Sequence, residues 1–152
     1  MNAIDLQEMS HEDLNEPEKN NVGFIWLCPA ITLQGENILQ SMKLAEDFIK
    51  TYGFEPNICI LGISDRLVTL AILLIYDREV EGDDKKALEC HDLLLKKFIS
   101  LGYIPNRLGV QSMYLMPKTG TYYESFIKNM KNILDPNDVI SPGRYDFRNN
   151  WP

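Results

Sequence analysis

Apolar residues from position 22 onwards follow two spacings, one typical of β-strands and the other typical of α-helices. Continuous runs of β-branched and aromatic residues predict strands, and apolar residues that recur every three or four positions predict helices. One helix is expected between Gly35 and Gly53, because Ile38, Ala45 and Ile49 fall on one face. The predicted elements are strand 22–33, a helix within 35–53, strands 57–63 and 67–76, a helix within 84–102 and strand 104–111.

The order of these elements, β-α-β-β-α-β, predicts an α+β fold. It is the order of the split βαβ, or ferredoxin-like, arrangement, in which an antiparallel sheet carries its helices on one face. The run 67–76 is apolar on both sides, so it is expected in the middle of the sheet. Residues 64–66 form a short polar break compatible with a hairpin, and Pro29 marks an edge or a bend.

An additional C-terminal helix is predicted after the ferredoxin-like unit. Thr121 and Glu124 have the spacing of a capping box, in which each side chain pairs with a backbone N–H at the start of a helix. Asp135-Pro136 ends the helix, and residues 137–152 form an extended tail rich in turn-forming residues. The helix is expected to bury one apolar stripe, made of Tyr123, Phe126, Ile127, Met130, Ile133 and Leu134.

The negative charge of the chain is concentrated at its N-terminus. There are 22 acidic and 15 basic residues, which gives a formal net charge of −7. Residues 1–21 hold six of the acidic residues and one lysine, a balance of −5, so the rest of the chain carries −2. We therefore expect an acidic, flexible leader over 1–21 and one folded domain over 22–152. The sign of the charge argues against a nucleic-acid partner.

Several kinds of site and location are disfavoured by the residues present. The N-terminus lacks a basic region followed by an apolar run, and the longest apolar stretch has ten residues, half of what a membrane-spanning helix requires. Three cysteines without close spacing suit reduced thiols in a cytoplasmic protein. No metal site is expected, because only two histidines are present, and the dispersed glycines provide no phosphate-binding loop.

One pair of residues is a candidate binding group. Asn106 and Arg107 lie among apolar neighbours on a predicted strand, with tyrosines on both sides in the sequence. A guanidinium partly removed from water requires an anion or a stacked ring. A phenolate or carboxylate ligand would meet that requirement, and so would a structural ion pair with Asp65 or Glu124. His91 is expected to be a helix residue at the edge of the core rather than a base.

The segment from Lys131 to Arg144 contains a more specific motif. Its Leu-Asp-Pro-Asn sequence, followed by Val-Ile and Pro-Gly-Arg, resembles the C-terminal signature of FAD-linked oxidases of the vanillyl-alcohol oxidase and 4-cresol dehydrogenase family. The segment from Phe24 to Ala30 is similar to an aromatic strand of that family, and residues 74–78 are similar to its central strand. The resemblance covers residues 22–147 and corresponds to the C-terminal part of the substrate, or cap, domain.

The resemblance implies roles for individual residues. In that family a phenolic substrate, held as phenolate, loses a hydride from its benzylic carbon to the flavin. Asn106 and Arg107 stand where those enzymes place a Tyr-Arg pair that binds the phenolic oxygen. Trp26 or Phe24 would line the substrate pocket, and the catalytic residues stay unknown. The residues expected near the flavin are Pro142, Gly143 and Arg144.

The chain departs from that family in several respects. It has no counterpart of the N-terminal domain that holds most of the FAD, so FAD is expected only with a partner domain or subunit. Some members tether the flavin through a histidine, but Phe24 occupies the corresponding position here. Residues 66–70 lack the histidines that members carry at the start of the central strand. Asn106 replaces the tyrosine of the Tyr-Arg pair that binds the phenolic oxygen, a pair that we call the clamp.

Three functions are compatible with these observations. The chain is the substrate-domain portion of a flavin-dependent oxidoreductase acting on para-substituted phenols, or a stand-alone, catalytically inactive binding or dimerisation module, or a cofactor-free isomerase or cyclase. The first function predicts an FAD-binding subunit as partner and a phenolic small molecule as ligand. An apolar face left exposed for that subunit, or for self-association, is expected of a domain separated from a larger flavoprotein.

Overall fold

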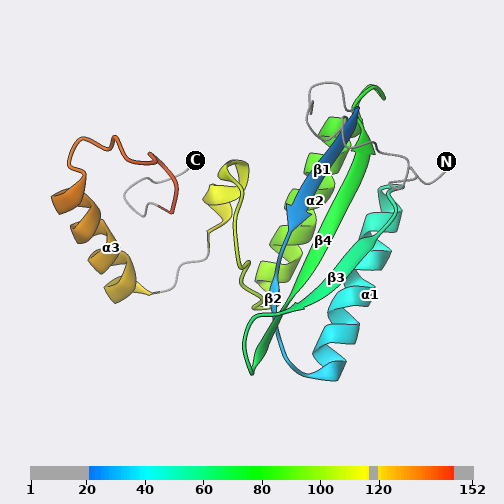
Figure 1. Cartoon of the computed structure of the whole chain (residues 1–152), viewed down its shortest axis with the longest axis horizontal. Coiled ribbons are helices and arrows are strands. Elements are labelled where there is room, and N and C mark those ends of the chain that lie inside the picture. The colour runs from blue at the N-terminus through cyan, green and yellow to red at the C-terminus, as the bar shows by residue number, and fades with distance from the viewer. Residues whose placement is uncertain (1–20, 117–119, 146–152) are drawn as a thin grey trace, which may run out of the picture.

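The structure is a computed structural model that describes residues 21–116 and 120–145. A sheet and two helices come first, and one separate helix comes last (Figure 1). The strands are β1 Val22–Leu27, β2 Ala30–Thr32, β3 Asn57–Gly62 and β4 Leu67–Asp77. The helices are α1 Gly35–Thr51, α2 Asp83–Ser100, the 3-10 helix η3 Val110–Leu115 and α3 Thr121–Leu134. We call residues 22–115, from β1 to η3, the body.

The strand β4 forms the centre of an antiparallel sheet, as its apolar sequence predicts. β3 pairs with one edge of β4 and places Ile58 opposite Ile72. β1 and β2 follow one another along the other edge and are separated by Cys28 and Pro29. Proline has no N–H to donate to a strand ladder, which explains why the first predicted strand is interrupted at this position.

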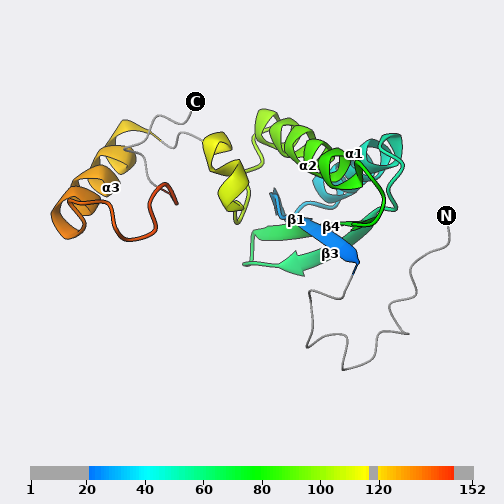
Figure 2. The same cartoon turned by 90° about the horizontal axis from the view of Figure 1, so that it is seen from above.

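Both helices of the body lie on one face of the sheet (Figure 2). Alternate residues of β4 point toward them, so Leu70, Ile72 and Leu74 are buried in the core. Ile49 of α1 and Phe98 of α2 pack against these strand residues from the helix side. Each large side chain contributes roughly 1.5–3 kcal/mol when fully buried, so the core stabilises the body without disulfides. The predicted fold class, α+β with an antiparallel sheet and an extra C-terminal helix, is confirmed.

The predicted strand over 104–111 is wrong in most of its length. Only Pro105 forms a bridge, with Pro29, and two backbone hydrogen bonds flank it. The Ala30 N–H donates to the Ile104 carbonyl at 2.9 Å, and the Asn106 N–H donates to the Cys28 carbonyl at 2.8 Å. Pro29 and Pro105 form a non-hydrogen-bonded pair, a position in an antiparallel ladder where neither residue needs an N–H, and among the described residues no backbone hydrogen bond continues the pairing beyond Asn106. The chain then turns into η3.

The C-terminal helix forms where it was predicted, but two details of the prediction are wrong. α3 begins at Thr121, so Gly120 rather than Thr121 occupies the N-cap position, and the Glu124 N–H donates to the Gly120 carbonyl at 3.2 Å. The apolar stripe is not buried, because α3 lies to one side of the body in both views (Figures 1 and 2) and no described element packs along it. The exposed members are Tyr123, Phe126, Met130, Ile133 and Leu134.

The predicted leader over residues 1–21 lies outside the described residues, apart from Asn21. The Asn21 carbonyl accepts a hydrogen bond from the Arg78 N–H at 2.7 Å, and the Asn21 amide donates to Glu79. The division into a leader and a domain, and the cytoplasmic location, stay predictions. Among the residues that the structure describes, no helix has the length and apolar character needed to cross a membrane.

Candidate functional site

The two aromatic residues predicted to line a pocket lie on the face of the sheet opposite the helices. Phe24 and Trp26 alternate along β1 with Ile25 and Leu27, which pack into the core. Phe24 is 59% exposed and Trp26 is 57% exposed, although such rings are usually at least half buried. We call this side of the sheet the outer face. Its exposed or half-buried apolar residues are Phe24, Trp26, Cys59, Leu61, Leu73 and Ile75.

The predicted clamp residues are held beside the end of β1. The hydrogen bond from the Asn106 N–H to the Cys28 carbonyl places Asn106 and Arg107 two residues beyond Trp26 along the sheet edge. Burial raises the pKa of the Cys28 thiol, and the positive charge of Arg107 partly offsets that rise. The structure therefore brings Trp26, Asn106 and Arg107 to one edge of the sheet.

The Arg107 side chain is exposed to solvent. Within the described part of the chain it forms no ion pair with Asp65 or with Glu124, the two residues that the sequence offered as alternatives to a ligand. Asp65 instead lies 3.8 Å from its neighbour Arg66. An exposed guanidinium at a sheet edge is available for an anionic ligand.

A polar cluster centred on Asp92 fixes the segment that follows Arg107. The Asp92 carboxylate accepts hydrogen bonds from the Ser112 hydroxyl at 3.3 Å and from the Tyr114 hydroxyl at 3.1 Å. His91 Nδ1 lies 2.8 Å from the same carboxylate, and the His91 ring is buried, as expected of a residue at the core edge. Burial and the hydrogen bond to Asp92 both raise the pKa of Tyr114. The cluster ties η3 to α2, and no local pattern in the sequence indicated it.

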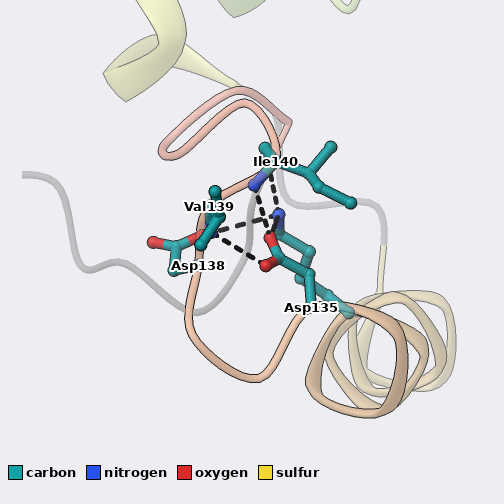
Figure 3. Close-up of polar contacts among 5 residues, drawn as sticks. Asp135, Asp138, Val139 and Ile140 are labelled. Carbon is teal, nitrogen blue, oxygen red and sulfur yellow. Dashed lines mark hydrogen bonds and ion pairs between the residues drawn. The ribbon is translucent and has the colours of Figure 1, made fainter.

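The family motif folds into a compact loop after α3 (Figure 3). The Asp135 carboxylate accepts hydrogen bonds from the N–H groups of Val139 at 2.8 Å and Ile140 at 2.9 Å, and it also accepts one from the Lys131 ammonium. The same ammonium donates to the Ile140 carbonyl and lies 3.5 Å from Asp138. The Lys131 contact, together with the two N–H groups, lowers the pKa of Asp135 to about 2. The motif is therefore a helix-ending loop with its own polar core.

The residues predicted near a flavin lie in the second half of this loop. Gly143 is buried and has a φ of +76°, a conformation that glycine adopts without strain. The Arg144 N–H donates to the Ser141 carbonyl at 3.1 Å, while Pro142 and the Arg144 side chain are exposed. We call α3 and the loop 135–145 the C-terminal arm.

Tyr145 connects the arm to the candidate site. Its hydroxyl accepts a hydrogen bond from the Leu108 N–H at 2.9 Å, one residue beyond Arg107. The predicted flavin-facing loop and the predicted clamp are thus joined through a residue that the sequence did not single out. Among the described residues, no group of three or more histidine, cysteine or acidic side chains could hold a metal ion.

No protein-family model matches the chain, but two curated proteins are similar to it. The chain is 34% identical over 137 residues to 1'-carboxy-chondrochloren decarboxylase of Chondromyces crocatus, a match that covers 90% of this chain and 25% of that protein. It is 24% identical over 123 residues to the flavoprotein subunit of 4-cresol dehydrogenase (hydroxylating) of Pseudomonas putida, which covers 80% of this chain and 23% of that subunit.

Solved structures share the fold. Substrate-bound p-cresol methylhydroxylase matches with a TM-score of 0.75 at 23% identity, over 85% of this chain and 25% of that one. The 4-ethylphenol oxidase of Gulosibacter chungangensis, in complex with isoeugenol, matches with a TM-score of 0.75 at 18% identity, over 90% of this chain and 26% of that one.

The chain spans about a quarter of the length of the proteins that it matches. Its homologues and structural neighbours include FAD-linked oxidases of the 4-cresol dehydrogenase type, and a match to about a quarter of their length is consistent with a C-terminal portion of the substrate domain. The resemblance seen in the sequence is confirmed.

Proposed function

We propose that this chain is the substrate-domain portion of a flavin-dependent oxidoreductase for para-substituted phenols, and that a partner domain or subunit binds the FAD. The similarity to phenol-oxidising relatives supports the activity. One observation carries the FAD-binding partner: two apolar surfaces have no cover among the described residues. Surfaces of this kind mark contacts with a partner.

The first surface is the stripe on α3. Phe126, Met130, Ile133 and Leu134 repeat at intervals that place them on one face of the helix, and Ile133 is 79% exposed. An amphipathic helix gains most of its stability from packing its apolar face, so this face requires a cover. The second surface is the outer face of the sheet. Together they provide a docking area on both the body and the C-terminal arm.

The chain by itself does not fit an FAD site. Its described glycines are dispersed and form no phosphate-binding loop. Gly143 is buried within its own loop, and the Arg144 N–H is already bonded to Ser141. FAD, which would supply the hydride acceptor, therefore belongs to the partner, while Pro142, Gly143 and Arg144 would border it from this side.

The site residues of this chain are suited to holding a phenolate. The Arg107 guanidinium would donate hydrogen bonds to the phenolic oxygen and favour its ionised form, because a fixed positive charge lowers the pKa of a neighbouring acid. The Asn106 amide would add a second donor in place of the tyrosine found in the family. Phe24 and Trp26 would contact the aromatic ring.

A second activity is favoured by the relative with the higher identity, which is named a decarboxylase. The same Arg107 guanidinium would bind a carboxylate in a planar, two-point arrangement. The two activities predict different ligands for one site, a phenol for the oxidase and an aromatic carboxylate for the decarboxylase.

Calorimetric titration with 4-ethylphenol and with 4-ethylbenzoate tests the proposed ligand, using the chain in complex with its FAD-binding partner. We expect saturable binding of the phenol, weakened by Arg107→Ala. Preferred binding of the benzoate would favour the decarboxylase. Binding of neither compound would leave the stand-alone module as the function of the chain.

The docking of the partner is tested by Ile133→Asp on α3, because a carboxylate within the stripe would be desolvated on binding. Ser125→Asp, on α3 but outside the stripe, is the matched control. We expect a flavin-containing complex, isolated from the native cells, to survive the control substitution and to be lost with Ile133→Asp. Loss with neither variant would remove α3 from the interface.

A further inference from the structure

The loop of the C-terminal arm contains an unusual concentration of left-handed backbone. Asp138, Ser141 and Tyr145 have φ values of 54°, 45° and 50°, which side chains other than glycine rarely adopt. Such conformations persist only where the surrounding contacts impose them. Asp135 and Lys131 provide those contacts at the start of the loop, as Figure 3 shows. The loop is therefore held in one strained course that ends at Tyr145.

This loop conformation brings the Tyr145 hydroxyl to the Leu108 N–H, which has no hydrogen-bond partner in a strand. Leu108 is only 4% exposed, and its N–H lies beyond the single bridge at Pro105, so the sheet offers it no acceptor. A buried N–H without an acceptor is costly, and the Tyr145 oxygen meets this need at 2.9 Å.

Arg107 lies between two anchors. On one side, the Asn106 N–H is bonded to Cys28 at the sheet edge; on the other, the Leu108 N–H is bonded to Tyr145 of the arm. Between the two anchors the backbone belongs to neither a strand nor a helix. The direction in which the Arg107 side chain leaves the body therefore depends on both contacts.

We propose that Tyr145 is a positioning residue for Arg107: by accepting the Leu108 N–H, its hydroxyl fixes the backbone from which the guanidinium reaches an anionic ligand. If the proposal is right, the geometry of Asn106 and Arg107 depends on the C-terminal arm. An effect of Tyr145 on phenol binding rests on the proposed function. Tyr145 itself is not assigned a contact with the ligand.

The test is Tyr145→Phe, which keeps the ring and removes only the acceptor. Tyr122→Phe is the matched control, because Tyr122 is 93% exposed on α3. In the full chain, hydrogen exchange of the Leu108 amide should accelerate about tenfold in Tyr145→Phe and stay unchanged in the control. Unchanged Leu108 exchange in Tyr145→Phe would overturn the proposal at its first step.

A second readout follows the guanidinium itself. Because the Arg107 charge acts on the Cys28 thiol, alkylation of Cys28 as a function of pH, resolved by mass spectrometry, reports where that charge lies. Arg107→Gln should move the Cys28 titration to higher pH, and Tyr145→Phe should reproduce part of that movement. A Cys28 titration unaltered by Tyr145→Phe, with Leu108 exchange accelerated, would show that Tyr145 holds only the backbone and would overturn the positioning role.

Ligand binding separates this proposal from the proposed function. If the complex binds 4-ethylphenol, Tyr145→Phe should weaken that binding about twofold to fivefold, because a residue that acts through Arg107 cannot cost more than the loss of Arg107 itself. If no phenol binds but Tyr145→Phe still moves the Cys28 titration, the proposed function fails while the positioning role stands. Phenol affinity that is equal in Tyr145→Phe and the wild-type chain would overturn the role.

Discussion

The body and the C-terminal arm of this chain differ in the solvent exposure of their apolar residues. In the body, apolar residues of β4, α1 and α2 are enclosed by one another, and polar contacts are secondary. In the arm, the apolar stripe of α3 is exposed, and the order comes from charged and polar groups around Asp135. The body encloses its own apolar core, whereas the apolar stripe of the arm has no cover among the described residues.

The largest expected difference concerns large-to-small substitutions in the two regions. Phe98→Ala removes a fully buried ring from the body and should lower the free energy of unfolding by about 3–5 kcal/mol. Ile133→Ala in the arm should change it by less than about 0.5 kcal/mol, because the side chain is already exposed. Urea denaturation of the isolated chain measures both, and a large cost for Ile133→Ala would mean that α3 packs within the chain.

A smaller effect is expected from acid, and it should be confined to the arm. The contacts with Lys131 and the two N–H groups hold the pKa of Asp135 at about 2, below its value in an unfolded chain. The carboxylate therefore stabilises the loop at pH values above the unfolded pKa, about 3.9, and this contribution is lost as the pH falls through about 2. Exchange of the Val139 and Ile140 amides should accelerate across that window. Asp135→Asn should remove the pH dependence, and a body amide serves as the control.

The contribution of Arg107 to ligand binding is expected to be modest, because its side chain is exposed. In the complex with the partner, Arg107→Ala should weaken 4-ethylphenol binding by about 1 kcal/mol, roughly fivefold. Arg66→Ala, which removes another exposed arginine, is the control for loss of charge. Equal affinities of the wild-type chain and Arg107→Ala in calorimetry would exclude Arg107 from the site.

The smallest effect is expected at the Asp92 cluster. Tyr114→Phe deletes one hydrogen bond to Asp92 while leaving the Ser112 contact in place. Because the deleted bond is exposed, the free energy of unfolding should fall by about 0.5 kcal/mol, the low end for one hydrogen bond. If the value were near zero, Ser112 alone would suffice to hold η3 on α2. Thermal denaturation followed by circular dichroism resolves a difference of this size.

Most of the body could be predicted from the sequence, because its strands and helices bury residues at the spacing that each element requires. The run 67–76 is the clearest example, since a strand that is apolar on both sides belongs in the middle of a sheet. The predicted strand 104–111 was wrong because an apolar run does not show that the chain leaves the sheet edge after Asn106 and turns into η3. For α3, periodicity identified an apolar face but could not tell whether this chain or another covers it.

The candidate site was predictable only in part. The motif after α3 was recognised from its sequence, and Asn106 and Arg107 stood out as polar residues in an apolar segment. Asp92 and Tyr145 were missed, because their contacts join residues 20 to 37 positions apart and leave no local pattern. Long-range polar contacts of this kind become visible only when the chain is folded.

The central claim is that this chain works with FAD held by another polypeptide. The most direct test is the flavin absorbance of the protein after gel filtration, measured once for the chain purified alone and once for the chain isolated from its native cells. We expect the chain alone to be colourless and the native preparation to be yellow and of larger size. A yellow chain that retains flavin by itself, or a colourless native preparation without a partner, would contradict the claim.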